Sequence, residues 1–223
     1  MFQGFSEKTI DFMWGIRFNN EKTWFEAHKE EYLSTLYEPM KELSRQVYGQ
    51  VMEEHGDLDL SRRVSRIYRD ARRLHGQGPY KDHLWCSMEQ LSDEWTARPT
   101  FWFELTPERY DWGMGYYMPK AVTMAKFRAR LDNNPKPFEK MARAFNKQDE
   151  FSLEGEDYKK PKGETTALLE PWYNKKTLAL TGHGLPSETF APAFADKLAA
   201  GYKELMPFYR YFLSLEGDPD PRV

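Results

Sequence analysis

The stretch TFWFELTPERYDWGMGYYM, residues 100–118, decides the fold class of this chain. Apolar and polar side chains alternate through residues 100–105, and residues 110–118 form a second run rich in aromatic side chains. Both runs have the pattern of β-strands. The link TPER between them is short enough for a hairpin loop, and strands joined in that way are antiparallel. Further strands are predicted at residues 63–72 and 82–88, so the middle of the chain forms an antiparallel sheet.

Helical periodicity is found on both sides of this sheet. Met40, Leu43, Val47 and Val51 recur at spacings of three and four residues, which predicts one apolar face of a helix. We expect an α+β fold in a single domain, with helices packed against an antiparallel sheet of about four to six strands. The domain covers residues 1–223, with helices at 6–55, the sheet at 62–118, helices at 119–147, an irregular region with one strand (KKTLAL, 175–180) at 148–186, and helices at 187–215.

Capping residues and prolines predict where the helices begin. Asn20 and Ser187 are candidate N-caps, since their side chains can accept hydrogen bonds from the first turn of a helix. Pro39 cannot continue a preceding helix, so a kink or a restart is expected there. Pro137 is expected to open another helix, and Pro207 is expected to restart the last one.

Length, charge and cysteine content narrow the class of protein. A chain of 223 residues can bury a substantial core, and a single cysteine cannot form an internal disulfide. The net charge of −3 argues against a protein that binds nucleic acid over its whole surface. No apolar run reaches the length of a membrane span, and the first residues do not resemble a signal peptide. We therefore expect a soluble cytoplasmic protein without membrane partners.

Residues 61–83 carry an excess of five positive charges, with six arginines and one lysine against Asp70 and Asp82. If residues 64–72 form a strand, Arg66, Tyr68, Asp70 and Arg72 share one face. Guanidinium groups bind phosphate and carboxylate oxygens through paired hydrogen bonds. We expect a small anionic ligand here, with Arg66, Arg69, Arg72 and Lys81 as donors, Asp70 orienting an arginine and Tyr80 supplying a hydroxyl.

The turn that follows these arginines contributes two glycines, Gly76 and Gly78, which permit the close backbone approach found in anion-binding nests. Asp70 and His83 are the candidate acid or base groups for catalysis, and the sequence identifies no nucleophile. The spacing of the histidines indicates no metal site. No cofactor is indicated either.

Several motifs together resemble the domain of unknown function 2461 family of bacteria and fungi. They are NNEKTWFEAHKEEY, SRIYRDARR, GPYKDHLW, the hairpin FWFEL…WGMGYYMP, and FRARL, and they cover nearly the whole chain in the same order. The resemblance implies an α+β fold and no established activity. The positions that match the family motif are Asn20, Trp24, Arg66, Arg69, Asp70, Arg72, Pro79, Tyr80 and Lys81, which adds Asn20 and Trp24 to the candidate ligand-binding residues.

The chain departs from this family pattern just before Gly78. Such proteins usually have an aromatic residue and an Asp-Lys pair there, whereas this chain reads Arg73-Leu74-His75-Gly76-Gln77. Either the acidic and basic pair is not needed, or this chain binds a different ligand and Arg73 and His75 replace the pair. Both interpretations stay open.

Three functions fit the arginine-rich segment. The leading one is binding of a small phosphate- or carboxylate-bearing ligand in a cleft lined by Arg, Tyr and Lys, either in an enzyme or in a binding protein. The second is a non-enzymatic interaction module for nucleic acid or an acidic protein partner. In the third, the motif is purely structural, and a buried pair between Arg69 and Asp70 fixes the register of the strand.

Overall fold

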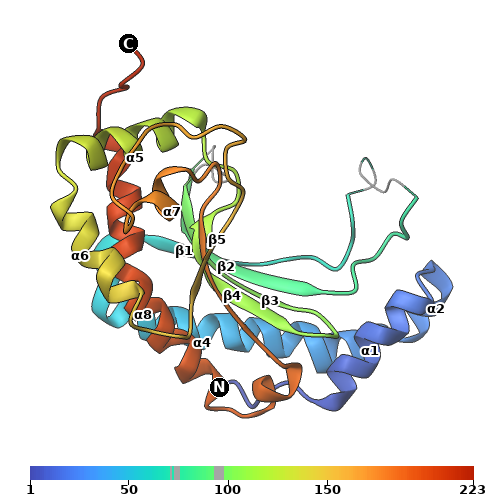
Figure 1. Cartoon of the computed structure of the whole chain (residues 1–223). Helices are drawn as coiled ribbons and strands as arrows, with labels where there is room; N and C mark the ends of the chain where they lie inside the picture. Colours follow the sequence, from blue (N-terminus) through green and yellow to red (C-terminus); the bar gives the residue numbers. More distant parts are fainter. Residues whose placement is uncertain (71, 73–75, 93–97) are drawn as a thin grey trace. The chain divides into compact units, whose positions relative to one another are not determined.

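The computed structural model describes residues 1–70, 72, 76–92 and 98–223. Within them, one antiparallel sheet has the strand order β1-β2-β3-β4-β6-β5. Figure 1 labels strands β1 to β5 on the ribbon. The strands are β1 (Leu60–Val64), β2 (Leu84–Gln90), β3 (Pro99–Leu105), β4 (Tyr110–Tyr116), β5 (Ser152–Glu154) and β6 (Ala179–Gly184). The predicted hairpin at residues 100–118 corresponds to β3 and β4, and the α+β class is confirmed.

Helices precede the sheet, follow its hairpin and close the chain. Before β1 lie α1 (Glu7–Phe18), α2 (Lys22–Ala27), α3 (Lys29–Glu31), the π-helix η1 (Tyr32–Tyr37), α4 (Glu38–His55) and the 3₁₀-helix η2 (Gly56–Leu58). After β4 come α5 (Ala121–Asn133), α6 (Lys136–Phe145), α7 (Glu170–Tyr173), the 3₁₀-helix η5 (Pro186–Phe190), α8 (Phe194–Leu213) and the 3₁₀-helix η6 (Ser214–Gly217). None of the described helices is long and apolar enough to cross a membrane.

The chain groups into two compact units, each made of several segments. Unit 1 contains Met1–Met88, Trp102–Trp112 and His183–Gly201. Unit 2 contains Glu89–Phe101, Gly113–Gly182 and Tyr202–Val223. The single domain over residues 1–223 stays a prediction.

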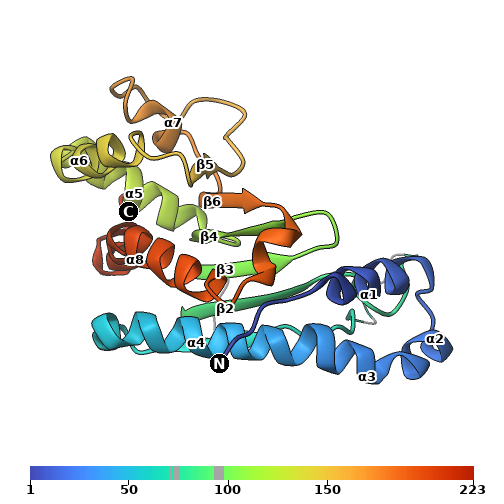
Figure 2. The same ribbon diagram turned by 90° about the horizontal axis from the view of Figure 1, so that it is seen from below.

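The core of unit 1 lies between α4 and the strands. The predicted apolar face of α4 is buried, with Met40, Leu43, Val47 and Val51 each at most 3% exposed. Figure 2 shows α4 alongside β2, and Ser44 of α4 lies beside the buried Cys86. Because neighbouring side chains in a strand point to opposite faces, Trp85 lies on the face of β2 that points away from α4. That face carries the candidate site.

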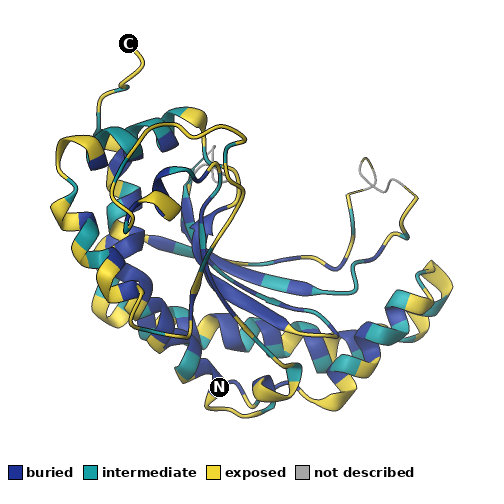
Figure 3. Ribbon diagram, viewed as in Figure 1, coloured by how far each residue is buried: buried dark blue, intermediate teal, exposed yellow. Residues whose placement is uncertain are grey.

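The core of unit 2 is a cluster of aromatic rings around Phe138 of α6. The Phe138 ring centroid lies 5.0 Å from that of Phe127 in α5 and 5.0 Å from that of Trp172 in α7. Phe208 and Phe212 of α8 complete the cluster. Figure 3 shows these helices buried on their inner sides and exposed on their outer ones, as expected for amphipathic helices.

The predicted strand at residues 63–72 is wrong over most of its length. Strand β1 ends at Val64, and residues 65–70 form only an isolated bridge, between Tyr68 and Tyr80. The reason lies at Ser65. Its backbone N–H donates to Trp85 O (2.8 Å), but the Trp85 N–H donates to the Ser65 hydroxyl (3.1 Å) instead of to a backbone carbonyl. The Ser65 side chain thus replaces a backbone acceptor in the hydrogen-bond ladder between β1 and β2, and the backbone after Ser65 separates from β2.

Two predictions about helix ends are wrong and two are confirmed. Glu21, not Asn20, is the N-cap of α2, because the Asn20 side chain is bound elsewhere. Pro207 lies inside α8 and does not restart it, since the flanking side chains are buried. Pro39 and Pro137 lie in the first turns of α4 and α6, as expected.

The carboxyl-terminal third also differs from its prediction. Strand β6 begins at Ala179, so it shares only two residues with the predicted strand KKTLAL (175–180). It pairs with β5, which was not predicted, and Leu153 lies opposite Leu180. Helix α8 begins at Phe194, after the 3₁₀-helix η5 that contains Ser187, so Ser187 does not cap it.

Candidate functional site

The two halves of the arginine-rich motif lie side by side in unit 1. Arg69 N donates to Pro79 O (2.8 Å), and Lys81 N donates to Ile67 O (2.7 Å). These two hydrogen bonds surround the isolated bridge between Tyr68 and Tyr80. Although residues 65–70 are not a strand, this short antiparallel contact brings the SRIYRD segment next to the PYK segment.

Asn20 holds the PYK segment from the amino-terminal helices. Its side-chain amide donates to Tyr80 O (2.9 Å), and its carbonyl oxygen accepts from Tyr80 N (2.9 Å). A Cβ at Gly78 would overlap the Asn20 side chain. The close approach at Gly78 therefore serves this internal contact, which differs from the predicted anion nest.

Two of the aromatic candidates are packing residues in this structure. The Tyr80 ring is 3% exposed and stacks on Phe25, with ring centroids 4.3 Å apart. Burial raises the pKa of Tyr80. Trp24 stacks on His28 at 3.9 Å and covers Gly15, where any Cβ would meet its ring. We find both rings engaged in internal contacts.

Replacing Asn20 with alanine is expected to lower the free energy of unfolding by about 1–2 kcal/mol. The change leaves the Tyr80 N–H without its acceptor and removes one donor from the Tyr80 carbonyl. Urea denaturation of Asn20→Ala measures the loss. Asn19→Ala is the control, because Asn19 is an exposed neighbour at the end of α1 whose side chain donates to Gly15 O. A loss no larger than that of the control would contradict the holding role of Asn20.

The predicted arginines fall into two groups. Arg69 Nε donates to Tyr80 O (2.9 Å), and its guanidinium lies 4.0 Å from Asp82. Arg72 instead pairs with Asp70 (2.7 Å) at the surface, where the Arg72 side chain is 87% exposed. Arg73 and His75, the suggested replacements for the family's Asp-Lys pair, lie outside the described residues.

Lys81 is the centre of a group of positive charges. Its amine is half-buried, and Arg63, Arg66 and Arg69 lie near enough to repel it, whereas Glu104 attracts it. Burial, aided by the three arginines, lowers the pKa of Lys81 to about 8. We call Arg63, Arg66, Arg69 and Lys81 the cation cluster.

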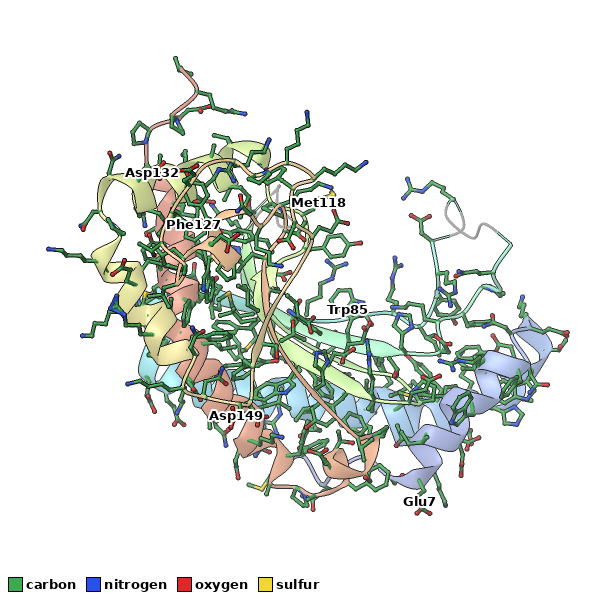
Figure 4. All side chains as sticks on the ribbon, viewed as in Figure 1. Glu7, Trp85, Met118, Phe127, Asp132 and Asp149 are labelled. Atoms are coloured by element: carbon green, nitrogen blue, oxygen red, sulfur yellow. The ribbon has the colours of Figure 1, made fainter. Side chains whose placement is uncertain are left out.

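Trp85 provides a flat surface beside the cation cluster. The Arg63 guanidinium lies 5.5 Å from the centroid of the Trp85 ring, and the Lys81 amine lies 5.7 Å from it. Both distances are within the range of cation–π attraction. Figure 4 labels Trp85 on β2. The indole therefore helps to hold two cations of the cluster close together.

His83 and Glu104 form an acid–base pair next to the cluster. His83 Nδ1 lies 3.0 Å from Asp82 Oδ1, and its Nε2 lies 3.6 Å from Glu104 Oε1. Burial raises the pKa of Glu104, although the nearby His83 acts in the opposite direction. An ionised Asp82 can only accept, so His83 Nδ1 is the donor of this contact, and Nε2 faces Glu104.

Arg17 of α1 fixes the orientation of this pair. Its Nε donates to Asp82 (2.6 Å), and its terminal nitrogens bind Glu108. Although burial acts to raise the pKa of Asp82, hydrogen bonds from His83 and Arg17 hold that pKa below its usual value. Asp82 thus stays a carboxylate that orients His83, the arrangement that prepares an imidazole for proton transfer.

A second histidine–carboxylate contact lies on the neighbouring strands of unit 1. His183 Nδ1 lies 2.6 Å from Asp111 Oδ1, and Arg109 Nε donates to Asp111 Oδ2 (2.9 Å). Asp111 also acts on Glu104, where its negative charge helps to raise the pKa. Among the described residues, no group of three or more His, Cys, Asp or Glu side chains could hold a metal ion.

Sequence reasoning missed two acidic residues and one histidine at this site. Glu104, Asp111 and His183 lie far from residues 61–83 in sequence, and only the order of the strands brings them near. One signal was present, because alternation in TFWFEL places Trp102 and Glu104 on the face opposite the core. Arg63 was missed because the predicted strand gave Arg66, Arg69 and Arg72 as the donors, and Trp85 was not singled out within the predicted strand 82–88.

Unit 2 contains a separate pocket of about 230 Å³. Arg98, Lys120 and Lys126 line it together with Tyr116 and Glu216. The Glu216 carboxylate accepts two hydrogen bonds from Arg98 (2.7 and 3.0 Å). Part of the positive charge that lines the pocket is therefore neutralised by Glu216. None of the residues predicted from the sequence lines this pocket.

Fold and site define an α+β protein whose antiparallel sheet carries a cationic, acid–base surface on one face. The chain belongs to a family of conserved hypothetical proteins, domain of unknown function 2461, whose family model matches residues 8–211. The predicted family is thereby confirmed. No curated protein matches the sequence.

Proposed function

We propose that the chain binds a small molecule carrying a phosphate or carboxylate group at the cation cluster. The observation that carries this proposal is the set of charges that act on the half-buried Lys81, where Arg63, Arg66 and Arg69 repel the ammonium, Glu104 attracts it, and the Trp85 ring holds Arg63 and Lys81 on one side. Like charges held this close destabilise one another, and a bound anion would relieve the repulsion. Arg66 and Lys81 keep the donor roles expected of them, and Arg63 takes the place of Arg72.

The acid–base pair supports an enzyme acting on that molecule. Burial raises the pKa of Glu104, which lies 3.6 Å from His83, and carboxyl groups with shifted pKa values gather at functional sites. An anion held by the cation cluster would place its neighbouring bonds near a proton donor and a proton acceptor. We propose His83 as the acid or base, with Asp82 orienting it. Asp70, bound to Arg72 at the surface, is not part of this proposal.

A structural role is the second candidate for part of the motif. Asn20, Arg69 and Tyr80 hold two loops together through hydrogen bonds and ring stacking. These three residues would be needed to form the site whether or not they touch a ligand. The proposal therefore assigns direct ligand contacts to Arg63, Arg66 and Lys81.

Thermal unfolding with inorganic phosphate tests the proposal. At a concentration about a hundredfold above Kd, one bound ligand adds about 2.7 kcal/mol of stability. For a chain of this length that corresponds to an increase of roughly 5–10 °C in the midpoint. Potassium chloride at equal ionic strength is the salt control. A phosphate effect no larger than that of chloride would contradict the proposal.

Matched arginine variants locate the phosphate effect. Arg63→Gln and Arg66→Gln remove cations that act on Lys81, and each is expected to abolish most of the phosphate-induced shift. Arg62→Gln is the control, since Arg62 is an exposed neighbour of the same charge that acts on Cys86 on the other face of the sheet. An equal loss in all three variants would show non-specific attraction. Tight binding of a polyanion such as heparin without a phosphate response would favour the interaction module.

A further inference from the structure

Lys81 differs from an ordinary surface lysine in its contacts. In the part of the chain that the structure describes, no carboxylate lies within 4.0 Å of its amine, and the one close partner is the Trp85 ring at 5.7 Å. The side chain is half-buried, Arg63, Arg66 and Arg69 lie near enough to repel its amine, and Glu104 is the acid that attracts it. These surroundings disfavour the ammonium form, because burial removes its hydration and the arginines repel it.

We propose that Lys81 is a nucleophilic amine that forms an imine with a small oxo acid, an aldehyde or ketone that carries a carboxylate or phosphate group. This inference rests on the proposed function, because the arginines would bind the acid group while the amine reaches the carbonyl carbon. Lysines that are desolvated or placed beside another cation are known to act as nucleophiles. The same arginines that bind the acid group therefore favour the neutral amine.

The surrounding residues supply what imine formation requires. The Lys81 nitrogen attacks the carbonyl carbon, the carbon–oxygen double bond becomes a single bond, and a proton passes from nitrogen to oxygen. The hydroxyl group then leaves as water, and the nitrogen loses its second hydrogen. Glu104, which acts on the Lys81 amine, and His83, whose Nε2 lies 3.6 Å from Glu104, would accept and return these protons. Apart from the water released, no atom or electron is gained or lost.

A neutral fraction at physiological pH is the condition for this reaction. With its pKa near 8, about a quarter of Lys81 is unprotonated at pH 7.5, whereas an ordinary lysine is unprotonated only about once in a thousand molecules. Lys159 and Lys160 in the exposed loop after β5 serve as internal references. Lys81 is expected to react at least tenfold faster than either.

Reductive trapping tests the inference on the full chain. The protein is incubated with glyoxylate and cyanoborohydride at pH 7.5, and each lysine is examined by peptide mass spectrometry for conversion to carboxymethyl-lysine. We expect at least tenfold more product at Lys81 than at Lys159 or Lys160, and inorganic phosphate should suppress it. Arg63→Gln should reduce the glyoxylate product at Lys81 at least threefold, whereas Arg62→Gln should leave it unchanged.

A neutral aldehyde tests whether Lys81 is reactive by itself, separately from whether the site prefers an oxo acid. Propanal, which carries no charge, should label Lys81 with little dependence on Arg63 or on phosphate. If Lys81 reacts no faster than Lys159 while phosphate still stabilises the protein, the imine inference is overturned and the proposed function stands. If glyoxylate and propanal label Lys81 with equal dependence on phosphate, the assignment of an oxo acid is wrong. Loss of the phosphate response itself would overturn both.

Discussion

Replacing Phe138 with alanine is expected to lower the free energy of unfolding by about 3–5 kcal/mol. Phe138 is 0% exposed, and its ring is in contact with rings from three helices of unit 2, including that of Tyr211 at 4.9 Å. Truncation removes the apolar area of the ring and leaves a cavity. The surrounding aromatic side chains are rigid and cannot fill it without leaving their preferred rotamers.

Urea denaturation followed by fluorescence measures this loss. Phe18→Ala is the matched control, because Phe18 is 75% exposed at the end of α1 and stacks on Trp14. Its substitution is expected to change the free energy of unfolding by less than about 0.5 kcal/mol. A loss below about 1 kcal/mol for Phe138→Ala would mean that the ring cluster is not the centre of the unit 2 core.

The parts of the fold that could be predicted are those in which local pattern and burial agree. In α4, the spacing of Met40, Leu43, Val47 and Val51 specified both the helix and the face that packs on β2. In β3, alternation specified which side chains are buried. Such elements need no information from the rest of the chain, because periodicity alone identifies their apolar face.

The arginine-rich segment was misassigned because one side chain decides its path. Residues 63–72 have the alternation of a strand, yet the Ser65 hydroxyl accepts the hydrogen bond that a backbone carbonyl would take. Beyond that point, Arg66 and Arg69 no longer alternate between faces, and both act on Lys81. Competition between a serine side chain and the backbone depends on tertiary contacts, which a single sequence does not reveal.

The basic residues of the candidate site were predicted from the sequence, whereas the carboxylates from the later strands were missed. Arg66, Arg69 and Lys81 stand close in sequence, so their shared charge was visible. Glu104 and Asp111 come from β3 and β4, and His183 comes from β6. These three residues come together only because of the strand order, in which β6 lies between β4 and β5. A single sequence does not show that order.

Replacing Lys81 with methionine is expected to stabilise the protein at pH 7 by about 2 kcal/mol. Burial lowers the pKa of Lys81 to about 8 in the folded chain, against 10.5 for an ordinary lysine. A depressed pKa means that the folded state resists the charged form, so the ammonium destabilises the fold. The full shift would correspond to about 3.4 kcal/mol, which we reduce because part of the side chain remains in water.

The sign of the pH dependence makes this prediction specific. Below pH 8 Lys81 is an ammonium in both the folded and the unfolded state, so burial of the charge destabilises the folded state fully. The free energy of unfolding of Lys81→Met should exceed that of the wild type by the largest amount in this range. Between pH 8 and 10.5 the folded state loses its proton before the unfolded state does, and the wild type should gain stability relative to the variant. Urea denaturation at pH 7, 8.5 and 10 measures the difference.

Lys29→Met is the control, because Lys29 is half-exposed and lies 3.9 Å from Glu26. This variant should show no gain in stability at pH 7, because the half-exposed Lys29 ammonium keeps its hydration. A protein keeps a destabilising residue where function requires it, so a gain in stability together with a lost phosphate response would assign Lys81 to the site. A Lys81→Met variant less stable than the wild type at pH 7 would instead show that the amine holds the fold together.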